Sequence, residues 1–125
     1  EWHSRILDAA DVFGPANVIP NFVAGVELAR PFGFESIDAA IASTVEGLDY
    51  FMGHGVTPRF TTWCPEPTTP LGRDNPDGAP LEYHVRLLGA YREALARNGL
   101  QAPPGYGEPG VGKAVFSVSS FMDVL

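Results

Sequence analysis

The sequence predicts an α/β fold in which helices and strands alternate along a single domain over residues 1–125. Two short runs, Val18 to Val26 and Val56 to Cys64, are rich in the β-branched and aromatic residues that strands prefer. Residues 36–54 and 81–98 carry apolar side chains at helical spacing. This order and spacing predict a parallel βαβα unit preceded by a helix.

Each predicted helix has recognisable end signals. The first, Trp2 to Phe13, is followed by Gly14-Pro15, which supplies a cap residue and a residue that cannot continue the helix. Ser36 is the expected N-cap of the second helix, Ser36 to His54. The third, Leu81 to Asn98, ends before a glycine, and its expected buried face consists of Leu81, Val85, Leu88, Tyr91 and Leu95.

The predicted strands raise the question of what completes the sheet. Val18 to Val26 is almost continuously apolar, which predicts burial on both faces, with Pro20 near the strand start. Two parallel strands cannot hide their edges or close a barrel. We therefore expect the chain to be incomplete on its own and to pair with a missing N-terminal half, covalent or separate. The tail, Ala114 to Leu125, is expected to form a further short strand or an extended closing segment.

Composition excludes several classes of function. Eight basic against fifteen acidic residues give a net charge of −7, which argues against a nucleic-acid-binding surface. No apolar run reaches the length that crosses a membrane, so we expect no membrane partner. The single cysteine, Cys64, cannot form an intrachain disulfide, and no leader pattern precedes the first helix. These features predict a reducing, cytoplasmic location.

Residues 107–114 match a phosphate-binding loop at both glycine anchors and at Lys113, but Ala114 stands where a serine or threonine would bind magnesium. The residues that follow favour a strand rather than the required helix. This motif therefore does not predict nucleotide hydrolysis.

The chain's three histidines, at positions 3, 54 and 84, lack the paired short spacing of structural zinc sites. Cys64 has no histidine near it in sequence that would activate it as a nucleophile. We expect a semi-buried structural thiol at this position.

The ends of the two predicted strands, Asn21 to Glu27 and Trp63 to Leu71, are the candidate site. Parallel α/β enzymes bind ligands beyond the carboxyl ends of their strands. Gly25 would allow a close approach, Glu27 would bring a carboxylate to this edge, and Pro65 would stiffen a wall. The alternative, equally open at this point, is that Gly25 and the prolines only shape turns.

These two segments resemble a known family, the radical S-adenosylmethionine (radical SAM) enzymes. Asn21 to Glu27 is similar to their fifth-strand motif, a β-run followed by Gly and Glu that lies along adenosine. Trp63 to Leu71 is similar to their sixth strand and its Pro-x-x-Gly-Thr-Pro-Leu loop, with Thr68 in place of the glycine. The resemblance covers nearly the whole chain and is closest to the biotin-synthase-like branch.

The resemblance implies the C-terminal portion of a (β/α) TIM-type barrel. It implies that Asn21, Gly25, Glu27, Cys64 and Pro65 line or support a site for S-adenosylmethionine. The family's [4Fe-4S] cluster, held by a three-cysteine motif, generates a 5′-deoxyadenosyl radical that abstracts hydrogen from a small-molecule substrate. Because this chain has one cysteine, the cluster ligands would lie outside it. The segment Ser119 to Asp123 is also similar to the serine-containing end of lipoyl synthases.

Two other functions remain open from the residues alone. The chain could be a non-catalytic half-barrel scaffold that stabilises a partner through exposed sheet edges and apolar surface. It could instead belong to a barrel enzyme without radical chemistry that uses Glu27 and Glu66 as an acid and base pair.

Overall fold

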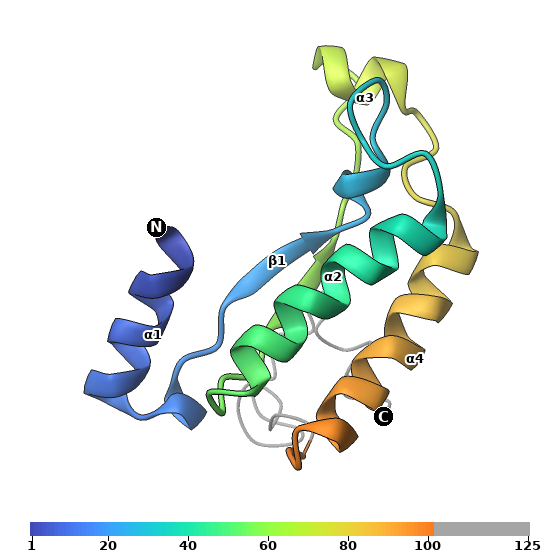
Figure 1. Cartoon of the computed structure of the whole chain (residues 1–125). Helices are drawn as coiled ribbons and strands as arrows, with labels where there is room; N and C mark the ends of the chain where they lie inside the picture. Colours follow the sequence, from blue (N-terminus) through green and yellow to red (C-terminus); the bar gives the residue numbers. More distant parts are fainter. Residues whose placement is uncertain (102–125) are drawn as a thin grey trace, which may run out of the picture.

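The computed structural model describes residues 1–101, which form an α/β unit with a two-stranded sheet (Figure 1). In chain order the elements are α1 (Trp2–Phe13), η1 (Pro15–Asn17), β1 (Asn21–Ala24), η2 (Val26–Leu28), α2 (Ile37–Met52), β2 (Arg59–Thr62), α3 (Pro70–Asp74) and α4 (Leu81–Arg97). The predicted tail strand, Ala114 to Leu125, lies outside the described residues.

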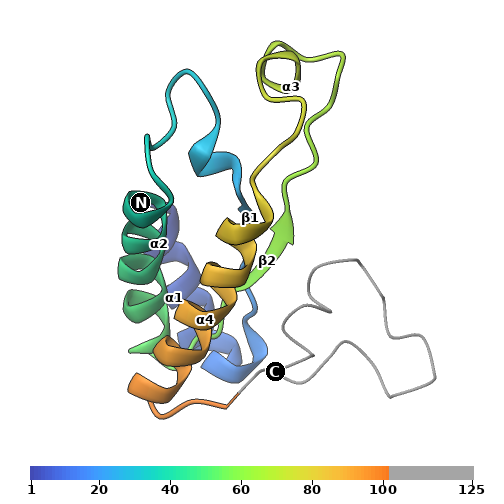
Figure 2. The same cartoon turned by 90° about the vertical axis from the view of Figure 1, so that its right-hand side faces the viewer.

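The two strands are parallel, with Asn21 paired with Arg59 and Ala24 with Thr62. Helix α2 makes the connection between them, so the predicted βαβ unit is present. The helices α1, α2 and α4 lie on one face of the sheet (Figures 1 and 2). Ser36 caps α2 as predicted, because its Oγ accepts a hydrogen bond of 3.1 Å from the backbone N–H of Ala39.

The strands are shorter than the sequence predicts, and the expected burial of the first strand on both faces is wrong. Asn21 and Val23 are exposed, whereas Phe22 and Ala24 face the helices. The described helices cover only one face, so alternate residues of β1 have different surroundings. Pro20 precedes the strand, which agrees with the expectation that a proline does not occupy its interior.

The core lies between the sheet and the pair α2 and α4. Its buried side chains are Ala24, Ala40, Leu48, Met52, Phe60, Tyr83, Leu87, Tyr91, Ala94 and Leu95. A second cluster joins Ala10 of α1 to Phe51 and Val56. Removing these side chains from water provides the main stabilisation of the unit.

The predicted buried face of α4 is wrong in its first half. Leu81 and Val85 are 76% and 60% exposed, whereas Tyr83 is fully buried. The helix is rotated so that Tyr83, Leu87 and Tyr91 face the sheet, each one helical turn from the next. This orientation directs Tyr83 and its neighbour His84 towards the strand ends.

Helix α3 is a short element between β2 and α4 for which the sequence predicts no helix. Thr69 caps it, with its Oγ1 accepting a 3.1 Å hydrogen bond from the N–H of Gly72, and Pro70 occupies the first helical position. Among residues 1–101, the structure contains no helix that is long and apolar enough to cross a membrane.

Candidate functional site

The candidate site lies beyond the carboxyl ends of β1 and β2, which parallel pairing places at the same edge of the sheet. Gly25 follows β1 directly, and Glu27 lies in η2. Cys64 and Pro65 follow β2 closely. Asn21 begins β1 and therefore lies at the opposite end of the strand, where its side-chain amide donates a 2.8 Å hydrogen bond to Thr61 Oγ1.

Gly25 is required by the packing of the chain itself. Its φ of +104° lies in the left-handed region, and a Cβ there would come within 2.7 Å of the Ala79 Cβ. The same Cβ would lie 3.8 Å from His84 Cε1 and 3.9 Å from Trp63 Cβ. The close approach expected at Gly25 is therefore made by the segment before α4, and the turn-shaping interpretation accounts for this glycine.

Glu27 is held by donors from the end of β1, from α2 and from α4. Its Oε2 accepts a 2.8 Å hydrogen bond from the backbone N–H of Gly25, and its Oε1 accepts bonds from the Tyr83 hydroxyl and, at 3.4 Å, from Thr44 Oγ1. Burial, followed by the Glu27 carboxylate, raises the pKa of Tyr83 above its ordinary value, so the phenol stays a donor. The carboxylate is thus fixed in position at the sheet edge.

His84 lies beside this carboxylate and is 8% exposed. Burial lowers its pKa below the ordinary value, and the negative charge of Glu27 opposes this effect. The spacing of the histidines in the sequence argues only against a zinc site and predicts no other role for His84. The structure brings it to the strand ends through the rotation of α4.

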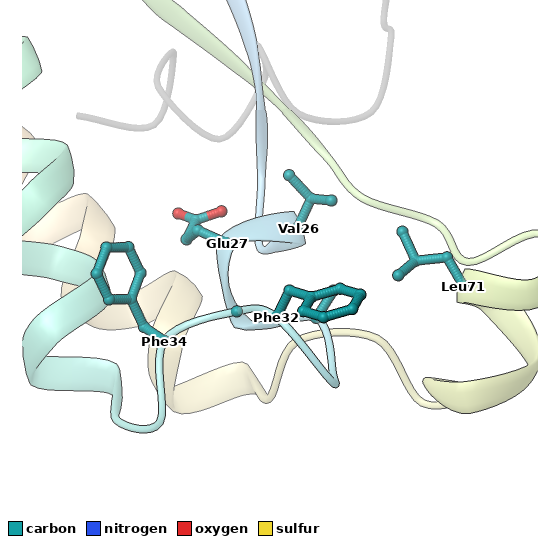
Figure 3. A pocket seen from close by; sticks show the side chains of 7 residues that line it. Val26, Glu27, Phe32, Phe34 and Leu71 are labelled. Carbon is teal, nitrogen blue, oxygen red and sulfur yellow. The ribbon is translucent and has the colours of Figure 1, made fainter.

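Glu27 also lines an open pocket of about 370 Å³ at this edge (Figure 3). The remaining wall is apolar, and its side chains come from η2, from the loop before α2 and from α3: Val26, Ala29, Phe32, Phe34 and Leu71, with Gly33 between the two phenylalanines. Phe32 is 95% exposed. A pocket of this size, lined by apolar side chains and by Glu27, can take a small ligand with apolar surface.

A single side chain fastens together the two loops that form this wall. Asn75 Oδ1 accepts a 2.8 Å hydrogen bond from the N–H of Arg30, and Asn75 Nδ2 donates to the carbonyls of Arg30 at 3.0 Å and Leu71 at 2.9 Å. The loop before α2 and helix α3 are therefore held at a fixed separation. Their separation sets the width of the pocket.

Cys64 is exposed, so the expectation of a semi-buried thiol is wrong. Its neighbour Pro65 supports the loop before α4, because a Cβ on Gly78 would come within 3.3 Å of Pro65 Cδ. Glu66 is engaged locally through Thr68, whose hydroxyl donates a 3.1 Å hydrogen bond to its carboxylate. Glu27 and Glu66 share no hydrogen-bond partner among the described contacts, and the acid and base pairing gains no support from them.

Sequence reasoning did not identify Thr44, Tyr83, Phe32 or Asn75 as site residues. Thr44 and Tyr83 belong to helices, and only the packing of those helices brings them to Glu27. Phe32 carried a usable signal, since it is a phenylalanine between Pro31 and Gly33, in the loop that joins the first strand to the next helix.

No protein-family model matches the chain, and neither a curated protein nor a solved structure gives a significant match.

Proposed function

We propose that this chain is the C-terminal part of a radical SAM enzyme and that it contributes contacts to S-adenosylmethionine and to a small-molecule substrate. The observation that carries the proposal is the pocket at the strand ends, where a fixed carboxylate meets apolar walls. The order of parallel strands and helices, and the motifs from Asn21 to Glu27 and from Trp63 to Leu71, give it further support.

The residues of the pocket fit the adenosine part of this cofactor. Val26, Phe32 and Leu71 offer apolar surface against which a flat purine ring would pack (Figure 3). Each carboxylate oxygen can accept two hydrogen bonds. Among the described residues, only the Gly25 N–H donates to Glu27 Oε2. Glu27 can therefore accept one more bond, from a hydroxyl or an N–H of the ligand.

When bound beside a reduced [4Fe-4S] cluster, S-adenosylmethionine supplies the 5′-deoxyadenosyl radical that abstracts a hydrogen atom. The role proposed for this chain is binding and orientation. Phe32 and Leu71 would shield the adenosine group from water, and Glu27 would fix its position. Because Cys64 is the only cysteine, the cluster ligands are assigned to a missing N-terminal half, in the same reducing cytoplasm.

The half-barrel scaffold is a second candidate, because one face of the sheet is exposed at Asn21, Val23 and Thr61. A scaffold would use this face and the strand edge to stabilise a partner. It would need no cofactor at the strand ends.

Purification of the native protein without oxygen, together with every chain it carries, separates these functions. The proposal predicts bound iron, the visible absorption of an iron-sulfur cluster and formation of 5′-deoxyadenosine from S-adenosylmethionine after reduction. A colourless, iron-free protein that binds a second chain tightly would contradict the radical enzyme and favour the scaffold. An iron-free protein without a partner would contradict both.

A further inference from the structure

We infer that the free edge of β1 pairs with a parallel β-strand in the native protein, and that apolar side chains packed on this strand fill the groove beneath Trp2. This inference takes from the proposed function only that the chain belongs to a larger α/β sheet. It does not depend on radical chemistry.

The hydrogen bonds of β1 identify the backbone groups that face away from β2. The carbonyls of Pro20 and Ala24 accept hydrogen bonds from the N–H groups of Arg59, at 2.8 Å, and Trp63, at 2.9 Å. Alternate residues of a strand present their backbone groups to opposite edges, so Asn21 and Val23 present theirs to the other edge. Among residues 1–101, no strand pairs with this edge. Its unpaired donors and acceptors form a template for another strand.

The position of α1 shows which kind of strand fits this edge. Helix α2 connects β1 to β2 on the helical face of the sheet, and α1 lies on the same face, beside the free edge of β1 (Figures 1 and 2). Connections between parallel strands have one hand, so crossovers on the same face move along a sheet in one direction. A strand that leads through α1 into β1 would therefore lie on the side of β1 opposite β2, parallel to it.

A groove of about 420 Å³ runs along this part of the molecule, between α1, β1 and α2. Its lining is mostly apolar and includes Trp2, Phe22, Val23, Gly47 and Phe51. The ring of Trp2 lies 5.5 Å from that of Phe22 and 6.0 Å from that of Phe51, yet the residue is 59% exposed. Side chains packed on an added strand would cover this surface.

Gly47 provides room for such an occupant. It lies inside α2, and a Cβ placed on it would meet nothing within 4 Å. Glycine inside a helix destabilises the helix relative to alanine. Because Gly47 has no side chain, the backbone of α2 is exposed at the wall of the groove. A side chain of the added strand can approach it closely.

The occupant we infer is a polypeptide strand parallel to β1, with apolar side chains packed on the helical face. A small apolar ligand would fill the groove but would leave the backbone groups of Val23 unpaired. Two copies related by a two-fold axis would pair these edges antiparallel, against the direction that α1 and α2 indicate. The partner segment would belong to the missing half, covalent or separate.

Residue-resolved amide hydrogen exchange on the native protein, with every chain it carries, tests the pairing. The Val23 amide should exchange at least about tenfold more slowly than the same amide in the unfolded chain, as expected for a paired strand. The amide of Ala24, which faces β2, is the internal reference. Rapid exchange at Val23 with slow exchange at Ala24 would overturn the inference. If the Val23 amide exchanges slowly only when two identical chains associate reversibly, the added strand comes from a second copy. This result would also overturn the inference.

Two pairs of variants in the native protein test the edge and the groove separately. Val23→Pro removes the amide that faces the free edge and leaves every β1–β2 hydrogen bond in place, whereas Val23→Thr keeps it. Gly47→Trp fills the groove, whereas Gly47→Ala adds a single methyl group in open space. The proline and tryptophan variants should release the added strand, seen as partner loss or as proteolysis of that strand, and the controls should retain it. Retention in both Val23→Pro and Gly47→Trp would overturn the inference.

These experiments can contradict the added strand and the radical chemistry independently of one another. A protected Val23 amide in an iron-free protein would leave the added strand in place and remove the radical chemistry. An exposed Val23 amide in a protein that forms 5′-deoxyadenosine would do the reverse.

Discussion

The hydroxyl of Tyr83 donates a hydrogen bond to the carboxylate of Glu27 and joins α4 to the end of β1 across 56 positions of sequence. Tyr83 is fully buried, so no water competes for its hydroxyl. Its raised pKa keeps the proton on the phenol over the physiological range of pH. The position of the candidate carboxylate therefore depends on the packing of α4.

Replacing Tyr83 with phenylalanine should lower the free energy of unfolding by about 1–3 kcal/mol, because a half-buried carboxylate loses a donor while the ring stays in place. Urea unfolding of both proteins measures the difference. Tyr50→Phe is the matched control, since this residue is 42% exposed. A Tyr83→Phe protein as stable as its Tyr50→Phe counterpart would contradict a structural role for the bond.

Stability should fall at alkaline pH. Burial raises the pKa of Tyr91 to about 12, although the nearby Arg59 charge opposes it. A tyrosine in the unfolded chain has a pKa of about 10, so above this pH the unfolded state loses a proton that the folded state keeps. The free energy of unfolding should then decrease between about pH 10 and 12, by up to about 1.4 kcal/mol per pH unit for Tyr91.

Urea titrations at a series of pH values check the slope, and Tyr91→Phe should reduce it. This variant also loses the 2.8 Å hydrogen bond to the carbonyl of Pro58, so its stability at neutral pH should be lower. The slope, rather than the absolute stability, is the measured quantity. An unchanged slope would show that Tyr91 titrates alike in both states.

His84 should make the chain less stable below about pH 6.5. Its pKa is lowered in the folded chain by burial, so the unfolded state takes up a proton first as the pH falls. Neutral His84 therefore contributes fully to the free energy of unfolding above about pH 6.5. This contribution is lost as the pH falls from about 6.5 to the pKa of His84 in the folded chain. His84→Gln should flatten the pH dependence of the free energy of unfolding in this range, which urea unfolding at a series of pH values measures.

Phe32→Ala should weaken binding of an adenosine ligand by about tenfold or more, because the pocket loses an aromatic wall. Stability should change by less than about 0.5 kcal/mol, since Phe32 is 95% exposed. Phe13→Ala is the control, because Phe13 is also exposed and lies on α1. Titration of the native protein with S-adenosylmethionine, without a reductant so that the ligand is not cleaved, measures the affinity. Equal affinities in the two variants would exclude this pocket as the adenosine site.

The sequence was sufficient for those elements whose signals are local. Ser36 marks the start of α2, and helical spacing predicts α2 and α4 to within a few residues. The carboxyl ends of the strands, Ala24 and Thr62, lie within two residues of the predicted ones, because Gly25 and Pro65 mark them locally. Each of these inferences requires only neighbouring residues.

The site residues that escaped prediction depend on rotation and packing. Counting apolar positions selects Leu81 and Val85 as the buried face of α4, but Tyr83 and His84 reach the sheet instead. Tyr83 also lies at helical spacing from the buried Leu87 and Tyr91, so the pattern allowed two faces, and the packing of α4 buries the one whose phenol bonds Glu27. The width of the pocket depends likewise on Asn75, whose loop has no regular periodicity.

Asn75→Ala should loosen the pocket more than it destabilises the chain. The alanine loses both bonds to the backbone of Arg30 and the bond to the carbonyl of Leu71, but water can reach these partly exposed groups. We expect a loss of about 1–2 kcal/mol in stability. The amides of residues 30–34 should exchange faster, because no other described hydrogen bond involves the Arg30 amide.

Asn17→Ala, which removes one bond to the carbonyl of Phe13, is the control and should leave exchange in the loop unchanged. If exchange at Arg30 is equal in the two variants, Asn75 does not hold the loops together. A faster exchange with unaltered affinity for S-adenosylmethionine would place the ligand elsewhere.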